Sequence, residues 1–435
     1  MADHGIGWAE ALLGLDGFRV IDVANGDAEL VVTVETTATV VTCEGCGVRA
    51  ESQDRVERHL RDLPCFGRPV RLVWHKRRWR CRHEACPRRT WTEAHDAVSA
   101  RAVLTRRAGW EMTRQVGANA RPVAQLAREF GVEWSTVMAA VVEHGTPLVD
   151  DPDRVGTVTT LGVDETSFLK ANRWHATQYV TGFVDLDHKR MIDLVEGNDA
   201  NAVKAWLAGQ AEEWRRGVAT VATDLAESYR AGMSPHLDHA VRVADPFHVV
   251  RVANRCVDVV RRRVQNETLG HRGRKADPLF KIRKLLLKGA ERLDDRGTDR
   301  MLLGLRVGDP DEELLGAWLA KESVRDIYLT NDPVDAAILI DKAIAGCAED
   351  DVEEIQALGR TLAAWRTEIL AHHDTGASNG PTEGLNLLVK KVKRCGHGFK
   401  RFDHYRLRVL LHCGGIDWKT PSPPTLRPHA PHSNA

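Results

Sequence analysis

Residues 158–166 read VTTLGVDET, and the rest of the sequence is best understood from this stretch. The approach to Asp164 is short, apolar and rich in β-branched residues, a composition typical of a buried strand. Asp164 stands where such a run ordinarily ends in a turn. A carboxylate at the edge of a buried sheet is costly unless a cation or hydrogen bonds compensate its charge. For this stretch taken alone, a solvated aspartate at a strand end is the ordinary alternative.

The distribution of charge along the chain favours a polyanionic partner. The 435 residues are enough for about three domains, and their formal net charge is zero. Lys and Arg nevertheless exceed Asp and Glu by twelve to four in residues 71–114, by thirteen to five in 251–294 and by eight to one in 390–408. Acidic residues concentrate instead between 309 and 354. One basic segment is explained by a solvated surface, but three are better explained by binding to a polyanion.

The cysteines predict a metal site. The sequence shows no signal peptide and no run of about 18 apolar residues, which predicts an intracellular protein without a membrane segment, so its nine cysteines should be mostly reduced. Cys43 and Cys46 form a CxxC pair, and Cys81 and Cys86 form a CxxxxC pair. Two such pairs can supply four thiolates to a tetrahedral ion, so the spacing predicts structural Zn²⁺ in a zinc-ribbon-like finger. Four buried or free thiols are the alternative.

The segment between the cysteine pairs is rich in Arg and Trp. Residues 74–80 read WHKRRWR. Arginine side chains bind phosphates and flat aromatic rings pack against sugar or base, so this composition is typical of a nucleic-acid contact. We therefore take Arg77, Arg78 and Arg80 as candidate DNA-binding residues. The alternative, that the tryptophans fill a small core, is compatible with this interpretation.

A helix-turn-helix pattern follows. Residues 123–137 read VAQLAREFGVEWSTV, in which Gly131 permits a turn between two short helices. The second helix would begin near Trp134 and enter a major groove, which makes Trp134, Ser135 and Thr136 candidate DNA contacts. An ordinary helical hairpin would give a similar pattern. Turn-forming residues from Gly145 onward then predict a domain boundary near residue 150.

Residues 157–250 predict a mixed α/β sheet, because they read as three strands, a helix, a strand, a helix and a strand. After the strand of Asp164, strands are expected at 179–184 and 190–195, and an amphipathic helix at 200–214. A further apolar strand then ends in Asp224.

The remainder of the chain is predicted to be mainly helical. Residues 251–370 read as a helical insertion, with an apolar stripe at steps of three and four. The stripe consists of Val352, Ile355, Leu358, Leu362, Trp365 and Ile369. A helix should begin near Pro381 and carry Glu383 in its first turn, where an acid is also favoured for capping alone. Its core-facing positions are predicted to be Leu385, Leu388 and Val392. The tail from Lys419 is rich in Pro, Ser and His, and we expect it to be disordered.

Three acids stand out in this reading. Asp164 and Asp224 each follow a strand, and Glu383 lies at the start of a late helix. Two adjacent strands and one packed helix can gather three carboxylates around a pair of Mg²⁺ ions. Two metals about 3.5–4 Å apart activate the attacking oxygen and stabilise the leaving oxygen in phosphodiester transfer. Hard divalent ions prefer oxygen ligands, which carboxylates supply.

Taken together, the motifs resemble the DDE transposases of the insertion-sequence ISL-three family over nearly the whole chain. The resemblance rests on the CxxC/CxxxxC finger, LGVDETSF (161–168), ATDLAESYR (222–230), ADPFHVVR (244–251), SNGPTEGLNLLVKKVKR (378–394) and HGF (397–399). It implies an RNase H-like catalytic domain, an α/β fold with a mixed sheet, in which Asp164, Asp224 and Glu383 form the acidic triad with Mg²⁺ or Mn²⁺. It also implies a large helical insertion between the second aspartate and the glutamate.

The domain organisation expected on this basis has six parts. They are strands and a zinc-binding finger (1–98), a helix-turn-helix domain (99–150), the first part of the catalytic core (151–250), the helical insertion (251–370), the C-terminal core helix with the glutamate (371–418) and the tail (419–435).

The resemblance implies an enzyme that binds the terminal inverted repeats of its insertion sequence and catalyses strand cleavage and strand transfer without a covalent protein–DNA intermediate. Lys390, Lys391, Lys393 and Arg394 would hold phosphates near the metals. His248 and Asn386 are candidates for supporting the site, with ordinary hydrogen bonding as the alternative. The expected partners are DNA and a second copy of the chain, and the expected location is the cytoplasm, at the bacterial nucleoid.

Two other functions fit parts of the pattern. One is a catalytically inactive DNA-binding regulator derived from such an enzyme, which the intact triad disfavours. The other is an RNase H-like nuclease that cuts DNA without joining it.

Overall fold

The computed structural model describes residues 3–419, which divide into two units described separately below. Unit 2 comprises Val155–Leu387, and unit 1 comprises the residues on either side of it. The division falls inside the helix α15 (Gly380–Cys395), whose first part belongs to unit 2 and whose second part belongs to unit 1. The tail predicted to be disordered lies outside the described residues, apart from Lys419.

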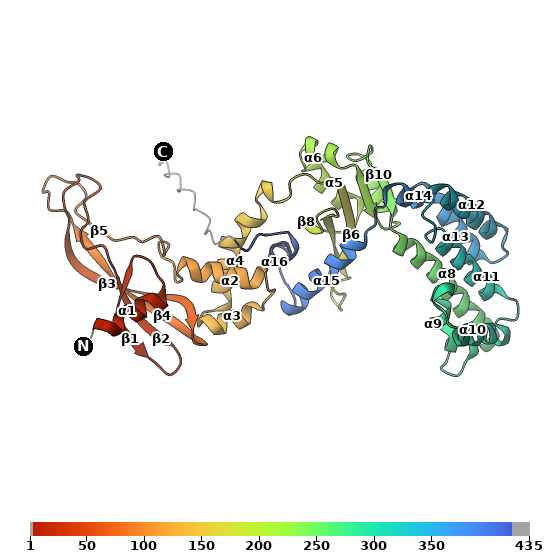
Figure 1. Cartoon of the computed structure of the whole chain (residues 1–435), viewed down its shortest axis with the longest axis horizontal. Coiled ribbons are helices and arrows are strands. Elements are labelled where there is room, and N and C mark those ends of the chain that lie inside the picture. The colour runs from red at the N-terminus through yellow and green to blue at the C-terminus, as the bar shows by residue number, and fades with distance from the viewer. Residues whose placement is uncertain (1–2, 420–435) are drawn as a thin grey trace. The chain divides into compact units, whose positions relative to one another are not determined.

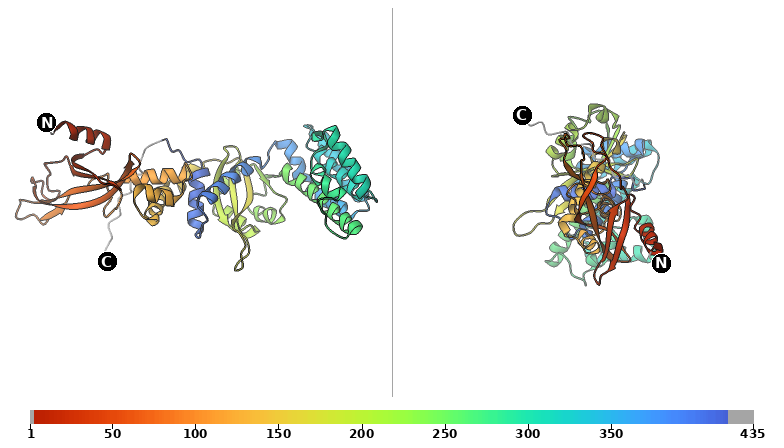
Figure 2. Two further views of the ribbon diagram at one scale, coloured as in Figure 1. Left: turned by 90° about the horizontal axis from the view of Figure 1, so that it is seen from below. Right: turned by 90° about the vertical axis from the view of Figure 1, so that its left-hand side faces the viewer.

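Unit 1 begins with a helix and a five-stranded sheet (Figures 1 and 2). These elements are α1 (Asp3–Leu13), β1 (Phe18–Asn25), β2 (Leu30–Thr36), β3 (Glu51–Cys65), β4 (Arg68–Arg80) and β5 (Thr90–Thr92). The strand order is β1-β2-β4-β3, with β5 paired to β4, and only the β2–β4 ladder is parallel. β1 and β2 form an antiparallel hairpin and pair as far as Asn25 opposite Leu30.

The segment between the cysteine pairs forms the long β3–β4 hairpin, which the cysteine spacing did not predict. Successive side chains of a strand point to opposite faces, and the buried residues of β4 change face along the strand, from Val70, Leu72 and Trp74 to Arg77 and Trp79. Trp74 meets Phe18 edge to face with ring centroids 5.3 Å apart. The interpretation that tryptophans fill a small core is therefore confirmed for Trp74, which packs in the core of this sheet, and Trp79 is also buried.

The rest of unit 1 is helical. It contains α2 (Arg106–Gly117), α3 (Val123–Phe130), α4 (Trp134–Val149), a short 3₁₀ turn (Pro152–Arg154) and α16 (Phe402–Cys413). Gly131 joins α3 to α4 with a φ of +64°, a left-handed conformation that glycine adopts without a steric penalty. α4 continues past Gly145 through Pro147 and ends at Val149, so the turn-forming residues from Gly145 do not end the helix at once. Proline removes only its own N–H, and the helix ends two residues later.

Unit 2 contains the predicted mixed sheet, which is confirmed. Its elements are β6 (Thr160–Leu169), β7 (Gln178–Asp185), β8 (Arg190–Glu196), α5 (Ala200–Ala208), α6 (Glu212–Gly217), β9 (Thr220–Thr223), α7 (Glu227–Met233) and β10 (Val241–Ala244). The order is β10-β9-β6-β7-β8, antiparallel across β6–β7–β8 and parallel across β6–β9–β10. The single helix expected at 200–214 is interrupted at Gly209, where α5 ends.

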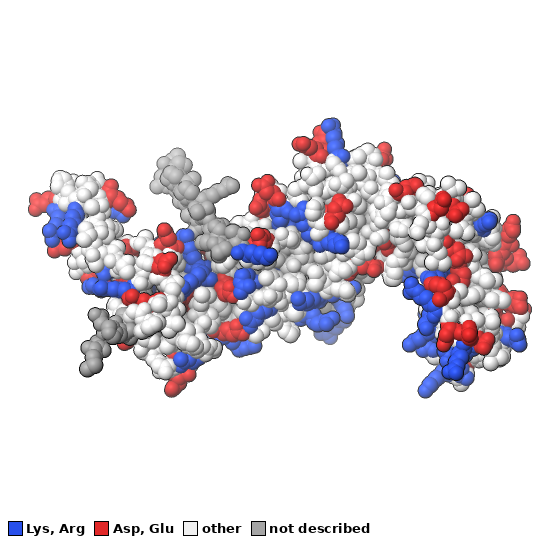
Figure 3. Space-filling view, in the orientation of Figure 1, with Lys and Arg blue, Asp and Glu red and all other residues white. Residues whose placement is uncertain are grey.

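A helical segment follows the sheet, as predicted. It comprises α8 (Pro246–Leu269), α9 (Pro278–Leu286), a 3₁₀ turn (Ala290–Arg292), α10 (Asp295–Gly308), α11 (Glu313–Asp326), α12 (Pro333–Glu349), α13 (Glu353–Ala364) and α14 (Arg366–Thr375). Figure 1 shows α8 leaving the sheet and entering this bundle. The predicted apolar stripe is buried, but it is divided between α13 and α14 at Trp365. Basic side chains gather where α9 and α10 end the bundle (Figure 3).

α15 returns the chain to the sheet of unit 2. Leu385 and Val392 are buried as predicted, but Leu388 is exposed and Val389 is buried in its place. The buried positions therefore follow steps of four and three rather than three and four. Both patterns suit an amphipathic helix, so the sequence alone did not distinguish them.

Candidate functional site

Asp164 and Asp224 lie side by side on the sheet of unit 2. The parallel β6–β9 ladder ends with the pair Val163 and Thr223, and each aspartate is the residue that follows. β9 ends there, as predicted. β6 does not end, because it stays paired with β7 and places Asp164 opposite Gly182. The expectation of a strand end at Asp164 is therefore wrong, although its position beside Asp224 follows from the shared register.

Glu383 reaches the same edge through the anchored start of α15. The backbone N–H of Asn379 donates to Asp245 Oδ1 at 2.8 Å, and the Asn379 side-chain amide donates to the Val163 carbonyl at 3.4 Å. The Asn379 carbonyl accepts from the backbone N–H of Glu383 at 3.2 Å. Gly162 permits this approach, since a Cβ there would lie 2.6 Å from Thr382 Oγ1. Contacts to β6 and to the start of α8 thus fix the first turn of α15.

Two further side chains connect the three acids. His248 Nδ1 lies 2.7 Å from Asp224 Oδ1, and its Nε2 lies 3.7 Å from Glu383 Oε1. Asn386, one turn after Glu383, donates from Nδ2 to Asp164 Oδ2 at 2.6 Å. The structure therefore brings together the three acids and both residues named as their supports.

The site is partly buried and rich in negative charge. Burial, together with the neighbouring Asp224 carboxylate, raises the pKa of Asp164 to about 6. Burial disfavours the charged form of His248, but its contact with Asp224 outweighs this and raises the pKa of His248. Arg251 supplies a second cation, 3.8 Å from Asp224 Oδ2. Two carboxylates competing for positive charge in a partly buried site suit a divalent cation.

Sequence reasoning missed Asp245. It is 2 % exposed, and its Oδ2 has no hydrogen-bond partner among the described residues. Ligand atoms of Asp245, His248 and Glu383 lie within 4.8 Å of one another, so these three could also hold a metal ion. An Asp before Pro246 at the start of a helix is ordinarily interpreted as a cap. Here its side chain makes no cap hydrogen bond and binds Asn379 instead.

The four predicted zinc ligands form one cluster in unit 1. The Cys43 and Cys86 sulfurs are 3.8 Å apart, those of Cys46 and Cys81 are 3.5 Å apart, and all four lie within 4.8 Å. Ligands about 2.3 Å from a tetrahedral Zn²⁺ would have sulfurs roughly 3.8 Å apart, so the cluster fits that ion. Burial raises the pKa of Cys86, whereas for Cys43 burial is outweighed by hydrogen bonds from the Gly45 backbone and from neighbouring cysteines, which lower the pKa to about 7. Cys65 lies on β3 outside the cluster.

The candidate DNA-binding residues of β4 differ in exposure. Arg77 is 3 % exposed, and its guanidinium lies 3.0 Å from Glu35 and donates to the Thr36 and Ala38 carbonyls. The prediction that it contacts DNA is therefore wrong, because its donors are occupied inside the protein. Arg78 is partly exposed and pairs with Asp54 at 3.4 Å, while Arg80 is exposed.

The other candidates lie on helix surfaces. Trp134 and Ser135 are exposed at the start of α4, and Thr136 is half-buried. Lys390, Lys391 and Arg394 are exposed on the second part of α15, where Lys391 Nζ lies 3.3 Å from His412 Nε2; Lys393 is half-buried.

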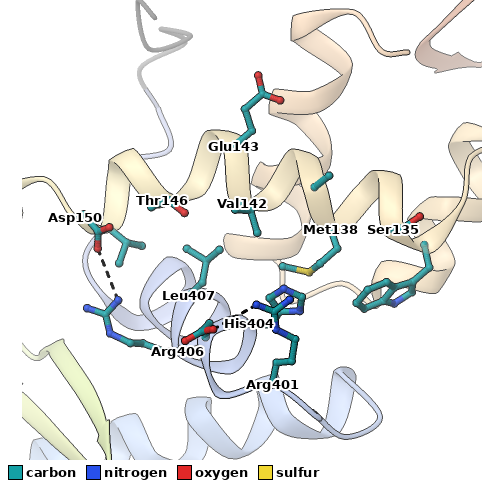
Figure 4. A pocket seen from close by; sticks show the side chains of 14 residues that line it. Ser135, Met138, Val142, Glu143, Thr146, Asp150, Arg401, His404, Arg406 and Leu407 are labelled. Carbon is teal, nitrogen blue, oxygen red and sulfur yellow. Dashed lines mark hydrogen bonds and ion pairs between the residues drawn. The ribbon is translucent and has the colours of Figure 1, made fainter. Parts of the chain in front are cut away.

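Figure 4 shows a cavity of about 630 Å³ between α4 and α16. Apolar side chains such as Met138, Val142 and Leu407 line it. Charged residues at its rim pair with one another, Arg406 with Asp150 at 3.7 Å and Arg401 with Asp403 at 3.5 Å.

Comparison with known proteins identifies the family. Residues 161–409, more than half of the chain, match the family model DDE_Tnp_ISL3, described as "Transposase". The chain belongs to the ISL3 transposase family. Residues 39–86, which contain the cysteine cluster, match the model described as "zinc-finger of transposase IS204/IS1001/IS1096/IS1165". The predicted family and zinc-finger assignments are confirmed.

Individual relatives carry corresponding descriptions. The chain is 24% identical over 410 residues to the transposase for insertion sequence element IS1001 of Bordetella parapertussis, covering 92% of this chain and 96% of that one. It is 25% identical over 289 residues to the transposase for IS1557 of Mycobacterium tuberculosis, covering 62% of this chain and 63% of that one. In the solved Drosophila P element transposase strand transfer complex, one chain aligns with 72% of this chain and 92% of its own length, at 11% identity and a TM-score of 0.38. That score is too low to establish a shared fold. No described helix of this ISL3 transposase is long and apolar enough to cross a membrane.

Proposed function

We propose that this transposase binds the terminal inverted repeats of its insertion sequence and catalyses metal-dependent DNA cleavage and strand transfer, with Asp164, Asp224 and Glu383 as its catalytic acids. The observation that carries the proposal is the proximity of these residues, which come from β6, β9 and α15 and are connected through His248 and Asn386. An RNase H-like core is part of the proposal, supported by three antiparallel strands followed by strands joined through helices.

The acids suit a hard divalent cation. Their donors are carboxylate oxygens, and the raised pKa of Asp164 reflects negative charge that a cation would neutralise. Mg²⁺ or Mn²⁺ held by Asp164, Asp224 and Glu383 would polarise the phosphodiester and stabilise the attacking and leaving oxygens. His248, ion-paired with Asp224 and close to Glu383, holds these two carboxylates near each other.

The reaction consists of two balanced displacements at phosphorus. In the first, a water oxygen bonds to the phosphorus at the element end, the bond to the 3′ oxygen breaks, and that oxygen leaves as a 3′-OH. In the second, the 3′-OH attacks a phosphodiester of target DNA and releases a target 3′-OH. One P–O bond forms and one breaks in each step. The protein therefore orients the strands and forms no covalent bond to DNA.

The other parts of the chain serve DNA recognition in this proposal. Structural Zn²⁺ held by Cys43, Cys46, Cys81 and Cys86 rigidifies the finger. α3 and α4 act as a helix-turn-helix domain whose exposed Trp134 and Ser135, with Thr136, contact bases in a major groove. Phosphate contacts come from Arg78, Arg80, Lys390, Lys391, Lys393 and Arg394. Pairing two element ends requires more than one active site, so we expect a homodimer on DNA, in the cytoplasm at the nucleoid.

The decisive experiment measures cleavage and joining of labelled DNA ends from the flanks of the reading frame. We expect the wild-type protein to cleave and join with Mg²⁺ or Mn²⁺, and Asp224→Asn to reduce both rates by about a thousand-fold or more while still binding DNA. Asp187→Asn is a matched control, because Asp187 is exposed and, among the residues that the structure describes, its side chain accepts only the Thr160 N–H, at 3.0 Å.

Retained cleavage by Asp224→Asn, in protein free of contaminating nuclease, would contradict the catalytic assignment. A wild-type protein that binds DNA equally well without divalent ions and never cuts it would be a regulator. Cleavage without joining would identify a nuclease.

A further inference from the structure

Arg408 on α16 is a buried cation without an anionic partner. Its side chain is 3 % exposed, and its one hydrogen bond to a described residue joins Nη2 to the Arg121 carbonyl at 3.4 Å. Its Nε has no partner among the described residues, and no described carboxylate lies within ion-pair distance. The guanidinium also lies over the Phe399 ring, 5.0 Å from its centroid.

Arg77 shows how this protein ordinarily accommodates a buried arginine. Arg77 is equally buried, but it pairs with Glu35 at 3.0 Å and donates to two backbone carbonyls. Burial lowers the pKa of Arg408 to about 10, and the Cys395 thiol opposes this only in part. The group is therefore still charged at neutral pH. A buried charge without a counter-ion is strongly unfavourable, so an external anion is the missing partner.

Arg408 lies in the wall of a cavity of about 510 Å³ in unit 1. The lining residues are Trp134, Met138, Gly396, Gly398, Phe399, Lys400, Arg401, His404 and Arg408. None is acidic, whereas the neighbouring cavity of Figure 4 contains three carboxylates, and the two share Arg401 and His404. Burial and the adjacent Arg401 both lower the pKa of His404, which agrees with a positive local potential.

The cavity wall is shaped by the segment that links α15 to α16. A Cβ at Gly396 would lie 2.5 Å from the Phe399 ring, so this position must be glycine for the ring to pack there. Phe399 in turn supports Arg408. This linker contains the HGF motif at 397–399, to which the catalytic proposal gives no role. Trp134, which also lines the cavity, is 48% exposed, and its ring centroid lies 6.3 Å from that of His404.

We propose that this cavity binds one backbone phosphate of DNA through Arg408, with Lys400 and Arg401 at its mouth and Trp134 against the adjoining sugar or base. The inference rests on the proposed DNA-binding function and adds a specific phosphate site to it. A planar guanidinium presents paired N–H donors that match two phosphate oxygens, and an exposed aromatic ring beside a basic groove suits a nucleotide. No lining carboxylate would repel the strand.

The first experiment measures the salt dependence of binding to a labelled mixed-sequence DNA duplex. Each phosphate contact contributes about 0.9 to the slope of log affinity against log salt. We expect Arg408→Met to reduce the slope by about this amount, and Arg408→Lys to retain the slope but bind several-fold more weakly because it loses the paired donors. Arg406→Met is the matched control, because Arg406 is on the same helix and already pairs with Asp150. Its slope should equal that of the wild type.

The second experiment separates a binding role from a structural one. Without ligand, Arg408→Met should unfold at the same temperature as the wild type or higher, since it removes an uncompensated buried charge. Inorganic phosphate should raise the unfolding temperature of the wild type more than that of Arg408→Met. If the two proteins show the same slope of log DNA affinity against log salt, while phosphate still raises the unfolding temperature of the wild type more, the cavity binds a free anion. That result would overturn the DNA assignment.

Other outcomes would also overturn the inference. A destabilised Arg408→Met whose loss of DNA binding matches its loss of folded protein would make Arg408 structural. If Arg408→Met does not fold, an Arg408→Lys protein that binds DNA as tightly as the wild type would contradict the paired-donor contact. Failure of the wild type to cleave DNA would overturn the proposed function instead. An unchanged slope in a protein that cleaves would overturn only this inference.

Discussion

The cysteine cluster of unit 1 and the acid cluster of unit 2 are both sets of ligands in need of a cation, and they are built differently. The cysteines come in two pairs, each within six residues of sequence, and the β3–β4 hairpin brings the pairs together. The acids come from two strands and a helix, separated by an entire helical segment. The cysteine cluster is thus defined largely by local structure, whereas the acid cluster exists only once the sheet and α15 have packed.

Their surroundings also differ. The four thiols contact one another and nearby backbone, where the His83 N–H lies 3.4 Å from Cys81 Sγ, and Trp91 is a partly buried apolar neighbour of the cluster. The acids already have protein partners, because His248, Arg251 and Asn386 contact them directly. The first arrangement suits an ion that holds the fold together, and the second suits an ion that enters and acts in a folded site. The following expectations test this distinction.

The largest effect is expected when the cysteine cluster loses a ligand. Cys86→Ser should release zinc and free the end of the β4–β5 ladder, where Arg80 pairs with Thr90. In small zinc fingers the metal contributes roughly 10–16 kcal/mol to folding, so the finger should unfold locally. Metal analysis should find a single zinc ion in each wild-type chain and almost none in the variant. Hydrogen exchange should show faster exchange of the β4–β5 amides.

Cys65→Ser is the matched control, since Cys65 lies on β3 outside the cluster. It should retain zinc and wild-type exchange. Full zinc content with unchanged exchange in Cys86→Ser would contradict a structural zinc site.

The same contrast explains which features could be predicted from the sequence. Cysteine spacing is local, so the four ligands were identified correctly. The mixed sheet and its strands were also readable, because their apolar runs are short and bounded by turns. The end of β9 at Asp224 followed for the same reason. β6 continues past Asp164 because it pairs with β7, and that register is set by tertiary structure rather than by the strand's own composition.

Features that depend on distant partners were not predictable. Arg77 and Arg80 look alike in sequence, yet Arg77 is buried because Glu35 lies beside it on the folded sheet. Asp245 resembles a helix cap until Asn379, more than a hundred residues later, donates to it. The three acids were grouped by family resemblance, since no pattern of composition connects residues so far apart.

An intermediate effect is expected at Asn386, which holds Asp164 without being one of the acids. Its amide donates to Asp164 Oδ2 at 2.6 Å, so Asn386→Ala should leave that carboxylate poorly oriented. Loss of a partner that orients a metal ligand typically reduces activity or metal affinity by about 10–100-fold. We expect the cleavage rate to fall in this range, a higher Mg²⁺ concentration at half-maximal rate, and unchanged DNA affinity.

Leu387→Ala provides the control for Asn386, because Leu387 is exposed on the same turn of α15. It should cleave at the wild-type rate. A wild-type Mg²⁺ dependence in Asn386→Ala would show that the hydrogen bond does not position Asp164.

The smallest effect is expected in the stability of metal-free protein, and it has the opposite sign from zinc loss. Burial, reinforced by Asp224, raises the pKa of Asp164 to about 6, so the folded protein binds this proton more tightly than the unfolded chain does. The free energy of unfolding should therefore fall as pH rises from about 4 to about 6. Above that range, the whole of this loss in the free energy of unfolding should remain. Because the site is partly exposed, solvent screening limits this loss in the free energy of unfolding to about 1–2 kcal/mol.

Asp164→Asn should accordingly be more stable than the wild type above pH 6 in the presence of chelator, and equally stable near pH 4, as measured by denaturant unfolding. Mg²⁺ should stabilise the wild type but not the variant. A variant that is less stable than the wild type at neutral pH would show that Asp164 is compensated by the protein itself. The acid cluster would then resemble an ordinary buried polar network, and the contrast with the cysteines would lose its basis.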